Sequence, residues 1–335
     1  MNNKIRFEET NCDFCGSKRY ELILNAKDHY NGIPGKFTVV KCSDCGLVYT
    51  NPRPTKNSMS FFYPDSAGYF IPTVTLDRGG FKKKREDILL REYYGYFPKI
   101  KRHILTKMIL SLFYLWTYRE LKISGLPHFV KNGSILDIGC SYGGFLSKMK
   151  KLGWKVKGIE LNKKSAEWGK RNFGLEILNT DIDHFKTNEK FDVITMGMLL
   201  EHVYSPKKVL KKVKNLLKPN GILIMSLPNF GGFEAKLYGK YAYTLHVPNH
   251  LTHFTPSTIK RYLILAGFKN IKIYYQKVDR DFIAPLRYMH EDGKNMDFLF
   301  KILSNRLIRK TFVKLFINMI SILHRTSRMT VYAYK

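Results

Sequence analysis

The stretch that decides the fold is Ser134-Ile135-Leu136-Asp137-Ile138-Gly139-Cys140-Ser141-Tyr142-Gly143-Gly144. Its first five residues form a short apolar run that predicts a buried strand, and a helix is expected from about Gly144 to Gly153. Small residues between a strand and a helix let a ligand approach the backbone and the helix N-terminus. The stretch therefore predicts a nucleotide-like cofactor at this turn. Glycines also serve ordinary turns, so the loop alone is a weak signal.

Strands and helices alternate after this loop. Elements alternating at this spacing imply right-handed crossovers and a parallel sheet covered on both faces. The predicted fold class is a Rossmann-like, doubly wound α/β sheet. Residues 328–334 alternate like a closing strand, which would pair with 271–275 around a helical insertion. The other predicted strands are 155–160, 175–178, 191–196 and 222–227, and the other helices are 163–172, 205–217 and 256–267.

Acidic residues accompany three of the predicted strands. Glu160 ends the second strand, a position from which a carboxylate can accept both hydroxyl protons of a ribose. Asp181 follows the third strand, and Asp192 lies at the start of the fourth. Open α/β sheets bind ligands at the carboxyl ends of their strands, so this pattern favours a cofactor with a ribose. The alternative for Glu160 is a solvated strand end.

Four motifs resemble those of the class I S-adenosylmethionine-dependent methyltransferases, over roughly residues 134–268. The resemblance implies that Asp137, Gly139 and Gly143 surround the methionine part of the cofactor, that Glu160 holds the ribose, and that Asp181 lies near the adenine. Ser141 replaces a glycine of the family's loop; we expect it to be tolerated if its backbone angles are ordinary and its hydroxyl faces the cofactor. The motifs are Leu136-Asp137-Ile138-Gly139-Cys140, Gly158-Ile159-Glu160, Asp181-Ile182 and Glu201-His202.

A dehydrogenase is the competing enzyme class, because it also pairs a glycine loop with a carboxylate after the second strand. Its fingerprint, Gly-x-Gly-x-x-Gly, is missing here. Counted from Gly139, the third and sixth positions are Ser141 and Gly144. A pyrophosphate-binding loop is therefore the poorer interpretation.

Two histidines are the candidate catalytic residues. His202, directly after Glu201, could take a proton from an acceptor hydroxyl because the unperturbed pKa of histidine is near neutral; capping the next helix is the alternative. His250 lies close to His246 and His253, in a stretch that resembles a His-Leu-x-x-Phe-x-Pro segment of many family members. We expect His250 to contact the substrate or transfer a proton. Three nearby histidines also allow a metal site, which is less favoured because no acidic ligand pattern accompanies them.

Four cysteines near the N-terminus have the spacing of a metal site. Cys12 and Cys15 form one Cys-x-x-Cys pair, and Cys42 and Cys45 form a second. Each pair is followed by glycine, as in two zinc knuckles whose thiolates complete a tetrahedral site. This cysteine usage fits a reducing compartment better than a disulfide framework. We therefore expect structural zinc in a cytoplasmic protein.

The segment Cys42–Pro52 resembles the zinc-binding segment of a subset of these enzymes, which includes sugar C-methyltransferases. The resemblance implies a saccharide acceptor, and it lets Tyr69 approach the cofactor, with core packing as the alternative. We expect methyl transfer to an oxygen or carbon of a saccharide or lipid-linked saccharide (glycolipid) in envelope polysaccharide biosynthesis. The alternatives are a nucleic-acid (RNA) or other small-molecule methyltransferase, and a non-enzymatic zinc- and nucleotide-binding interaction protein.

The chain is strongly basic, with 57 Lys and Arg against 27 Asp and Glu and a net charge of +30. This charge favours polyanionic partners, unless it only solvates the surface. No base-flipping or RNA-binding motif supports nucleic acid. The segment Phe298–Leu323 alternates apolar and basic residues, so it suits either the interface of an anionic membrane or a lid packed on the core. We expect peripheral association with the inner membrane face.

No membrane-spanning segment or signal peptide is expected. The longest apolar run of the basic connector, Met108–Tyr118, is shorter than the ~20 residues that span a bilayer, and the N-terminus lacks an apolar core. The expected organisation is a zinc-binding module at 1–54, a basic helical connector at 55–133, and a cofactor-binding domain at 134–335 with an amphipathic helical insertion at about 279–327. The sequence leaves the oligomeric state open.

Overall fold

The computed structural model describes residues 5–64, 81–98, 120 and 122–335. Tyr69 and the run Met108–Tyr118 lie outside the described residues. The chain divides into two compact units, each assembled from separate stretches. The first unit holds Met1–Tyr69, Met198–Lys214 and Ser226–Met329, and the second holds Phe70–Gly197, Asn215–Met225 and Thr330–Lys335.

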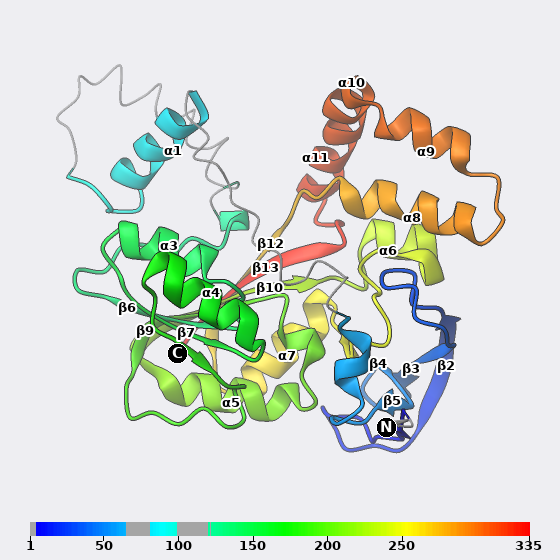
Figure 1. Cartoon of the computed structure of the whole chain (residues 1–335), viewed down its shortest axis with the longest axis horizontal. Helices are drawn as coiled ribbons and strands as arrows, with labels where there is room; N and C mark the ends of the chain where they lie inside the picture. The colour runs from blue at the N-terminus through cyan, green and yellow to red at the C-terminus, as the bar shows by residue number, and fades with distance from the viewer. Residues whose placement is uncertain (1–4, 65–80, 99–119, 121) are drawn as a thin grey trace. The chain divides into compact units, whose positions relative to one another are not determined.

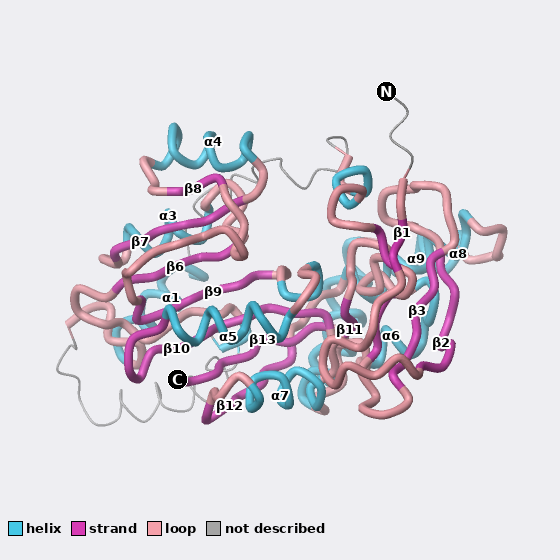
Figure 2. The backbone as a smooth tube through the Cα atoms, turned by 90° about the horizontal axis from the view of Figure 1, so that it is seen from below, coloured by secondary structure: helices cyan, strands magenta, loops and turns pink. Residues whose placement is uncertain are grey.

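A seven-stranded sheet has the order β12-β13-β10-β9-β6-β7-β8 (Figure 2). Strand β6 pairs in parallel with β7 and β9, and β7 pairs in parallel with β8. Strands β7 and β8 are therefore added on one side of β6, and β9 is added on the other side. This reversal places a topological switch point at the carboxyl end of β6, where such sheets bind ligands. The predicted Rossmann-like α/β class is confirmed. The strands are β6 (Ser134–Ile138), β7 (Lys155–Glu160), β8 (Ile177–Asn179), β9 (Phe191–Gly197), β10 (Leu217–Pro228), β12 (Lys269–Tyr275) and β13 (Arg328–Tyr334).

Strand β13 runs antiparallel to its neighbours. The N–H of Gln276, just past β12, donates to the carbonyl of Arg328 at the start of β13 (2.9 Å). At the β10 side, the N–H of Asn229 donates to Ser327 (2.7 Å) and that of Lys335 donates to Gly221 (3.0 Å). The end of each neighbouring strand therefore meets the start of β13, as the expected closing hairpin requires.

Helices α3 (Gly144–Lys151) and α4 (Lys163–Phe173) pack against strands β7 and β8, respectively. The Asn162 side chain accepts from the N–H of Ser165, and Gly174 ends α4 with a left-handed φ of 59°. Both features satisfy backbone groups that a helix end leaves open. Helices α5 (Pro206–Leu216) and α7 (Pro256–Leu265) follow β9 and precede β12; Thr255 begins α7 with a reciprocal capping box.

The cysteine-bearing segment forms a separate four-stranded sheet of order β11-β4-β3-β2. Its edge strand β11 comes from far along the chain, with Thr252 paired to Tyr49 and His253 to Val48. All pairings in this sheet are antiparallel. The strands are β2 (Tyr20–Ala26), β3 (Phe37–Cys42), β4 (Val48–Thr50) and β11 (Thr252–His253), and beside them β1 (Phe7–Glu8) pairs with β5 (Arg53–Pro54).

Between β12 and β13 the chain is helical, as Figure 1 shows in orange and red. No helix of the described ranges is long and apolar enough to cross a membrane. This stretch contains α8 (Arg280–Glu291), α9 (Asp297–Ser304), α10 (Arg306–Ile308), a π-helical turn η5 (Arg309–Val313) and α11 (Lys314–Ile322). The remaining helices are η1 (Met59–Phe62), α1 (Phe81–Glu92), η3 (Leu200–His202), α6 (Phe233–Tyr238) and η4 (Gly239–Tyr241).

Candidate functional site

The loop after β6 winds through left-handed backbone at alternate positions. Gly139, Ser141 and Gly143 have φ values of 72°, 50° and 80°. The condition of ordinary backbone angles, under which Ser141 is expected to be tolerated, is therefore not met: a non-glycine residue in this region costs about 1–2 kcal/mol. The Ser141 N–H donates to Oε2 of Glu160 (2.8 Å), so the turn is fixed by the carboxylate expected to hold the ribose.

At Gly143, close packing as well as a left-handed φ favours glycine. It immediately precedes α3, and a Cβ built on it would lie 2.4 Å from Cδ1 of Leu175. The turn is thus pressed against the segment that leads to β8. Glycine at this position lets the helix N-terminus open toward a ligand without a side chain in between.

Asp137 lies near the carboxyl end of β6, in register with Gly158 of β7 and Thr195 of β9. Its side chain is buried, and its Oδ1 accepts from the Thr195 hydroxyl (2.6 Å). Burial raises the pKa of Asp137 to about 7, despite the Thr195 hydrogen bond, which lowers it. A cation bound here would favour the carboxylate form, so the position suits the amino group of an amino-acid ligand.

Glu160, at the end of β7, presents a carboxylate fixed on both sides. Its Oε2 accepts from Ser141 and its Oε1 accepts from the N–H of Asn162, each at 2.8 Å. A carboxylate has about four acceptor positions, so two remain for the hydroxyl groups of a ribose. The Oδ1 of Asp181 accepts from the N–H of His184 (2.8 Å). Both residues belong to the second unit with the loop.

A second group of side chains, the Glu201 cluster, consists of Glu201, His202 and His250. One ligand atom of each lies within 4.8 Å of the others, and Nε2 of His250 is 4.0 Å from Oε1 of Glu201. Glu201 and His202 belong to η3, directly after β9 and Met198, and the carbonyl of Glu201 accepts from the N–H of Leu251 (2.7 Å). That backbone bond holds the two segments together within the first unit.

The hydrogen bonds of the two histidines fix their tautomers. Nδ1 of His202 lies 3.0 Å from the carbonyl of Asn249, and Nδ1 of His250 lies 3.0 Å from the carbonyl of Thr244. A carbonyl can only accept, so each Nδ1 carries the proton and each Nε2 carries the lone pair. The hydroxyl of Tyr63 is also 2.7 Å from Nδ1 of His202.

Burial shifts the pKa of every member of the Glu201 cluster toward its neutral form. The pKa of Glu201 rises to about 8, that of His202 falls to about 4, and that of His250 falls well below its usual value. Both imidazoles are therefore neutral at physiological pH. A histidine with so low a pKa accepts a proton weakly, so His202 alone is a poor general base.

The three histidines that the sequence places together remain neighbours, with the ring of His253 6.5 Å from that of His250 between centroids, but they have different partners. Nε2 of His253 lies 3.1 Å from the Thr50 hydroxyl, which ties β11 to the strand β4. His246 has a left-handed φ of 37°, and its ring lies 4.9 Å from that of His250 between centroids. The acidic member of the cluster, Glu201, comes from a distant part of the sequence, so the spacing of the histidines does not mark it as a metal ligand.

The four cysteines converge as their spacing predicts. Sγ of Cys12 lies 3.4 Å from that of Cys45, and Sγ of Cys15 lies 3.6 Å from that of Cys42. Tetrahedral zinc with Zn–S bonds of about 2.3 Å holds its sulfurs about 3.8 Å apart, so the residues present fit zinc. Both pairs form the same turn: the N–H of the residue four positions on, a glycine with left-handed φ, donates to the carbonyl of the first cysteine.

Comparison with known proteins connects the cofactor loop to one family. A family model described as a methyltransferase domain matches residues 115–273. The chain is 31% identical over 176 residues to the ubiquinone biosynthesis O-methyltransferase of Coxiella burnetii (strain Dugway 5J108-111), covering 46% of this chain and 72% of the relative. The chain belongs to the class I S-adenosylmethionine-dependent methyltransferases.

Another relative, the ubiquinone biosynthesis O-methyltransferase of Actinobacillus pleuropneumoniae serotype 5b, is 36% identical over 124 residues, 33% of this chain and 51% of that protein. The chain thus spans about half the length of that methyltransferase.

Solved methyltransferases resemble the chain only weakly. An S-adenosylmethionine-dependent methyltransferase from Thermotoga maritima aligns with a TM-score of 0.43 and 16% identity, over 69% of this chain and 96% of that chain. One from Archaeoglobus fulgidus has a TM-score of 0.42 and 19% identity, over 67% and 94%. We base the methyltransferase fold on the strand order and the family match.

The residues of the loop fit the cofactor of this methyltransferase family. Glu160 has two acceptor positions left for a ribose, Asp137 suits a cationic amino group, and the glycines leave the helix N-terminus accessible. Gly139, Ser141 and Asp181 complete the predicted set. His202 and His250 belong to the other compact unit, so their catalytic role remains a prediction.

Proposed function

We propose that the chain transfers the methyl group of S-adenosylmethionine to a hydroxyl oxygen of an amphiphilic acceptor at an anionic membrane surface. The observation that carries the cofactor half of the proposal is the Glu160 carboxylate, which is held at the end of β7 by Ser141 and Asn162. The preference for oxygen is supported by the relatives, whose names describe O-methyltransferases.

Methyl transfer depends more on the relative orientation of cofactor and acceptor than on a strong base. The cofactor, when bound, supplies an electrophilic methyl group on a positively charged sulfur, and the electron pair of the broken S–C bond stays on that sulfur. Glu160 and Asp137 would orient the cofactor, which is where most of the acceleration of such a displacement arises. The acceptor hydroxyl loses its proton in the same reaction. His202 and His250 are the proposed groups on the acceptor side.

Two acceptor classes share the required chemistry, a hydroxyl group on a lipid. A lipid-linked saccharide is supported by the four-cysteine module, through the resemblance of Cys42–Pro52 to sugar methyltransferases. A quinone precursor is supported by the names of the relatives. The comparisons give no support for the saccharide, and both acceptors carry a lipid.

The helical insertion offers an exposed apolar face that suits a lipid surface. Phe312, Leu315, Met319 and Ile322 follow one another at helical spacing, and between half and three quarters of each is exposed. On the opposite side of the same helices, Val313, Ile317 and Ile320 are buried against Ile283 of α8. These helices are apolar on both sides, but only the side that packs against α8 is buried, so the other side exposes apolar side chains to solvent.

The positive charge around this apolar face favours an anionic lipid surface as its binding partner. Lys310, Lys314 and Arg325 are exposed beside the apolar side chains, and Phe298 and Leu307 extend the face with more than 70% exposure each. Basic residues that flank exposed leucine and phenylalanine are typical of helices that lie in the headgroup region. Each such charge near an anionic surface adds about 1 kcal/mol.

Vesicle binding tests the proposed surface. Wild-type protein should co-sediment with vesicles of phosphatidylglycerol and phosphatidylcholine, whereas Leu315→Glu should reduce the bound fraction at least about fivefold, because a buried leucine is worth about 1.5–3 kcal/mol. Leu22→Glu, which alters a similarly exposed leucine on β2, is the control and should bind like wild type. Equal binding of all three proteins, or a stable dimer that hides the face, would refute this surface.

Methyl transfer itself is tested with radiolabelled S-adenosylmethionine. Incorporation into a glycolipid or a quinone precursor presented in the same vesicles is expected, with at least about tenfold less incorporation into water-soluble analogues of the same head groups. The acceptor that is labelled decides between the two lipid classes. Incorporation into RNA instead of either lipid would overturn the proposed acceptor.

A further inference from the structure

We propose that the Glu201 cluster is a binding site for a divalent transition-metal ion, with one carboxylate oxygen of Glu201 and Nε2 of His202 and His250 as ligands. This site is distinct from the four-cysteine centre, and its consequence for catalysis rests on the proposed function. One ligand atom of each residue, a carboxylate oxygen or a ring nitrogen, lies within 4.8 Å of the others.

The strongest observation is the carboxylate of Glu201. Only 1% of this residue is exposed, and neither of its oxygens has a hydrogen-bond partner among the described residues. Leaving such a group buried and unsatisfied costs about 1–3 kcal/mol, and more when it is charged. A buried carboxylate without a hydrogen-bond partner, with Nε2 of His250 4.0 Å from its Oε1, is explained if a cation lies between the two groups.

The hydrogen bonds of His202 and His250 orient both rings for binding the same cation. Each donates its Nδ1 proton to a backbone carbonyl, of Asn249 for His202 and of Thr244 for His250. Histidine ligands of metals almost always use their second nitrogen in this way, because the bond fixes the tautomer and orients the ring. The Nε2 lone pairs are then left for the ion.

The geometry needs only a small contraction. Ligand atoms about 2.0–2.2 Å from an ion lie about 3–4 Å apart, and Nε2 of His250 is already 4.0 Å from Oε1 of Glu201. His202 is only partly buried, so an ion and a further ligand can reach the cluster from its side. Three protein ligands leave coordination positions open, as in catalytic rather than structural sites.

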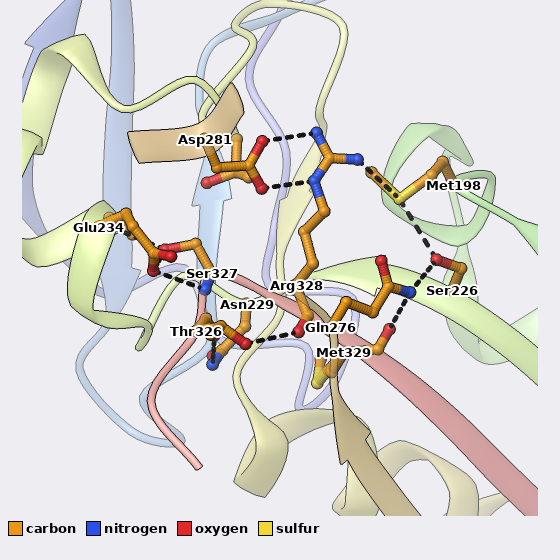
Figure 3. A network of polar contacts seen from close by, with 12 residues as sticks. Met198, Ser226, Asn229, Glu234, Gln276, Asp281, Thr326, Ser327, Arg328 and Met329 are labelled. Atoms are coloured by element: carbon orange, nitrogen blue, oxygen red, sulfur yellow. Dashed lines mark hydrogen bonds and ion pairs between the residues drawn. The ribbon is translucent and has the colours of Figure 1, made fainter. Parts of the chain in front are cut away.

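The guanidinium of Arg328, a positive charge that acts on Glu201, is paired with another carboxylate. The charge of Arg328 acts on Glu201, but its guanidinium is paired with Asp281, with Nη2 2.9 Å from Oδ1 and Nε 2.5 Å from Oδ2. Figure 3 shows this guanidinium facing Asp281, with Met198 on its other side. Within the described ranges Arg328 therefore makes no hydrogen bond to Glu201 and leaves the carboxylate to another cation.

The ligand set favours zinc or a similar ion over magnesium. Imidazole nitrogen with one carboxylate suits Zn²⁺ and Fe²⁺, whereas Mg²⁺ prefers oxygen ligands alone. With coordination positions open, an ion here would act as a Lewis acid toward an oxygen ligand.

The test is the zinc content of the full chain, measured by mass spectrometry after equilibrium dialysis against Zn²⁺ alone. Wild type should hold about two ions per chain, one in each site, and Glu201→Gln and His250→Gln should each hold about one. Glu234→Gln is the matched control, because it alters another buried carboxylate, which accepts from Ser327, and it should retain about two. The ion that remains in the four-cysteine centre reports that each variant is folded.

A second measurement needs no variant. Co²⁺ bound to wild type should give, beyond the thiolate charge-transfer bands of the cysteine site, a second spectrum typical of nitrogen and oxygen ligands. About one zinc per chain in wild type, or about two in Glu201→Gln, would overturn the proposal. Neither measurement uses cofactor or acceptor, so failure of this site is distinguishable from failure of the proposed methyl transfer.

Discussion

Alanine in place of Glu160 is expected to weaken the binding of S-adenosylhomocysteine by about 100-fold or more. A hydrogen bond to a charged acceptor contributes about 1.5–3 kcal/mol, and the ribose offers two of them. The substitution also removes the acceptor of the Ser141 and Asn162 N–H groups, so the loop loses its anchor. Equilibrium dialysis of the labelled ligand measures the change.

The control for this experiment is Glu167→Ala. Glu167 is a glutamate on the neighbouring helix α4, where it forms long ion pairs with Lys163 and Arg171. Its loss should leave affinity within about twofold, since surface ion pairs contribute little. If Glu160→Ala binds the ligand as tightly as Glu167→Ala does, Glu160 is not the ribose residue.

Serine in place of Cys42 is expected to lower the unfolding temperature by about 6 °C. The Sγ atoms of the four cysteines already lie at zinc-binding distances, and structural zinc contributes its binding free energy to folding. Loss of about 4 kcal/mol corresponds to a shift of this size. Scanning calorimetry gives the shift, and mass spectrometry gives the accompanying loss of zinc.

Cys140→Ser is the comparison for this variant. Cys140 is buried in the loop after β6, and it is the one cysteine outside the four-cysteine centre. Its replacement should leave the zinc content unchanged. A Cys42→Ser protein with wild-type zinc content and stability would show that these cysteines do not form a structural zinc site.

Much of the sheet is predictable because its strands carry local signals. Residues 134–138, 155–160 and 328–334 are strands with the predicted bounds, since each apolar or alternating run ends at a glycine, an acidic residue or the chain end. Weaker signals shift the boundaries: β8 begins at Ile177 rather than Leu175, and β10 already begins at Leu217, before the predicted turn. There, pairing with neighbouring strands overrides local preference.

The candidate site was predictable only where its residues are close in sequence. The loop, Glu160 and the cysteine pairs carry spacings that chemistry explains. The Glu201 cluster has no such spacing. Glu201 lies next to His250 because its carbonyl accepts from the N–H of Leu251, and no sequence pattern predicts this bond. The left-handed angle of Ser141 was equally hidden, since it follows from the hydrogen bond to Glu160.

The central claim, that the chain binds S-adenosylmethionine through the loop after β6, is tested most directly by calorimetric titration of the zinc-loaded protein with S-adenosylhomocysteine. The account predicts about one ligand per chain with a micromolar dissociation constant, about −8 kcal/mol. Absence of binding to folded, zinc-loaded protein at millimolar ligand would contradict it.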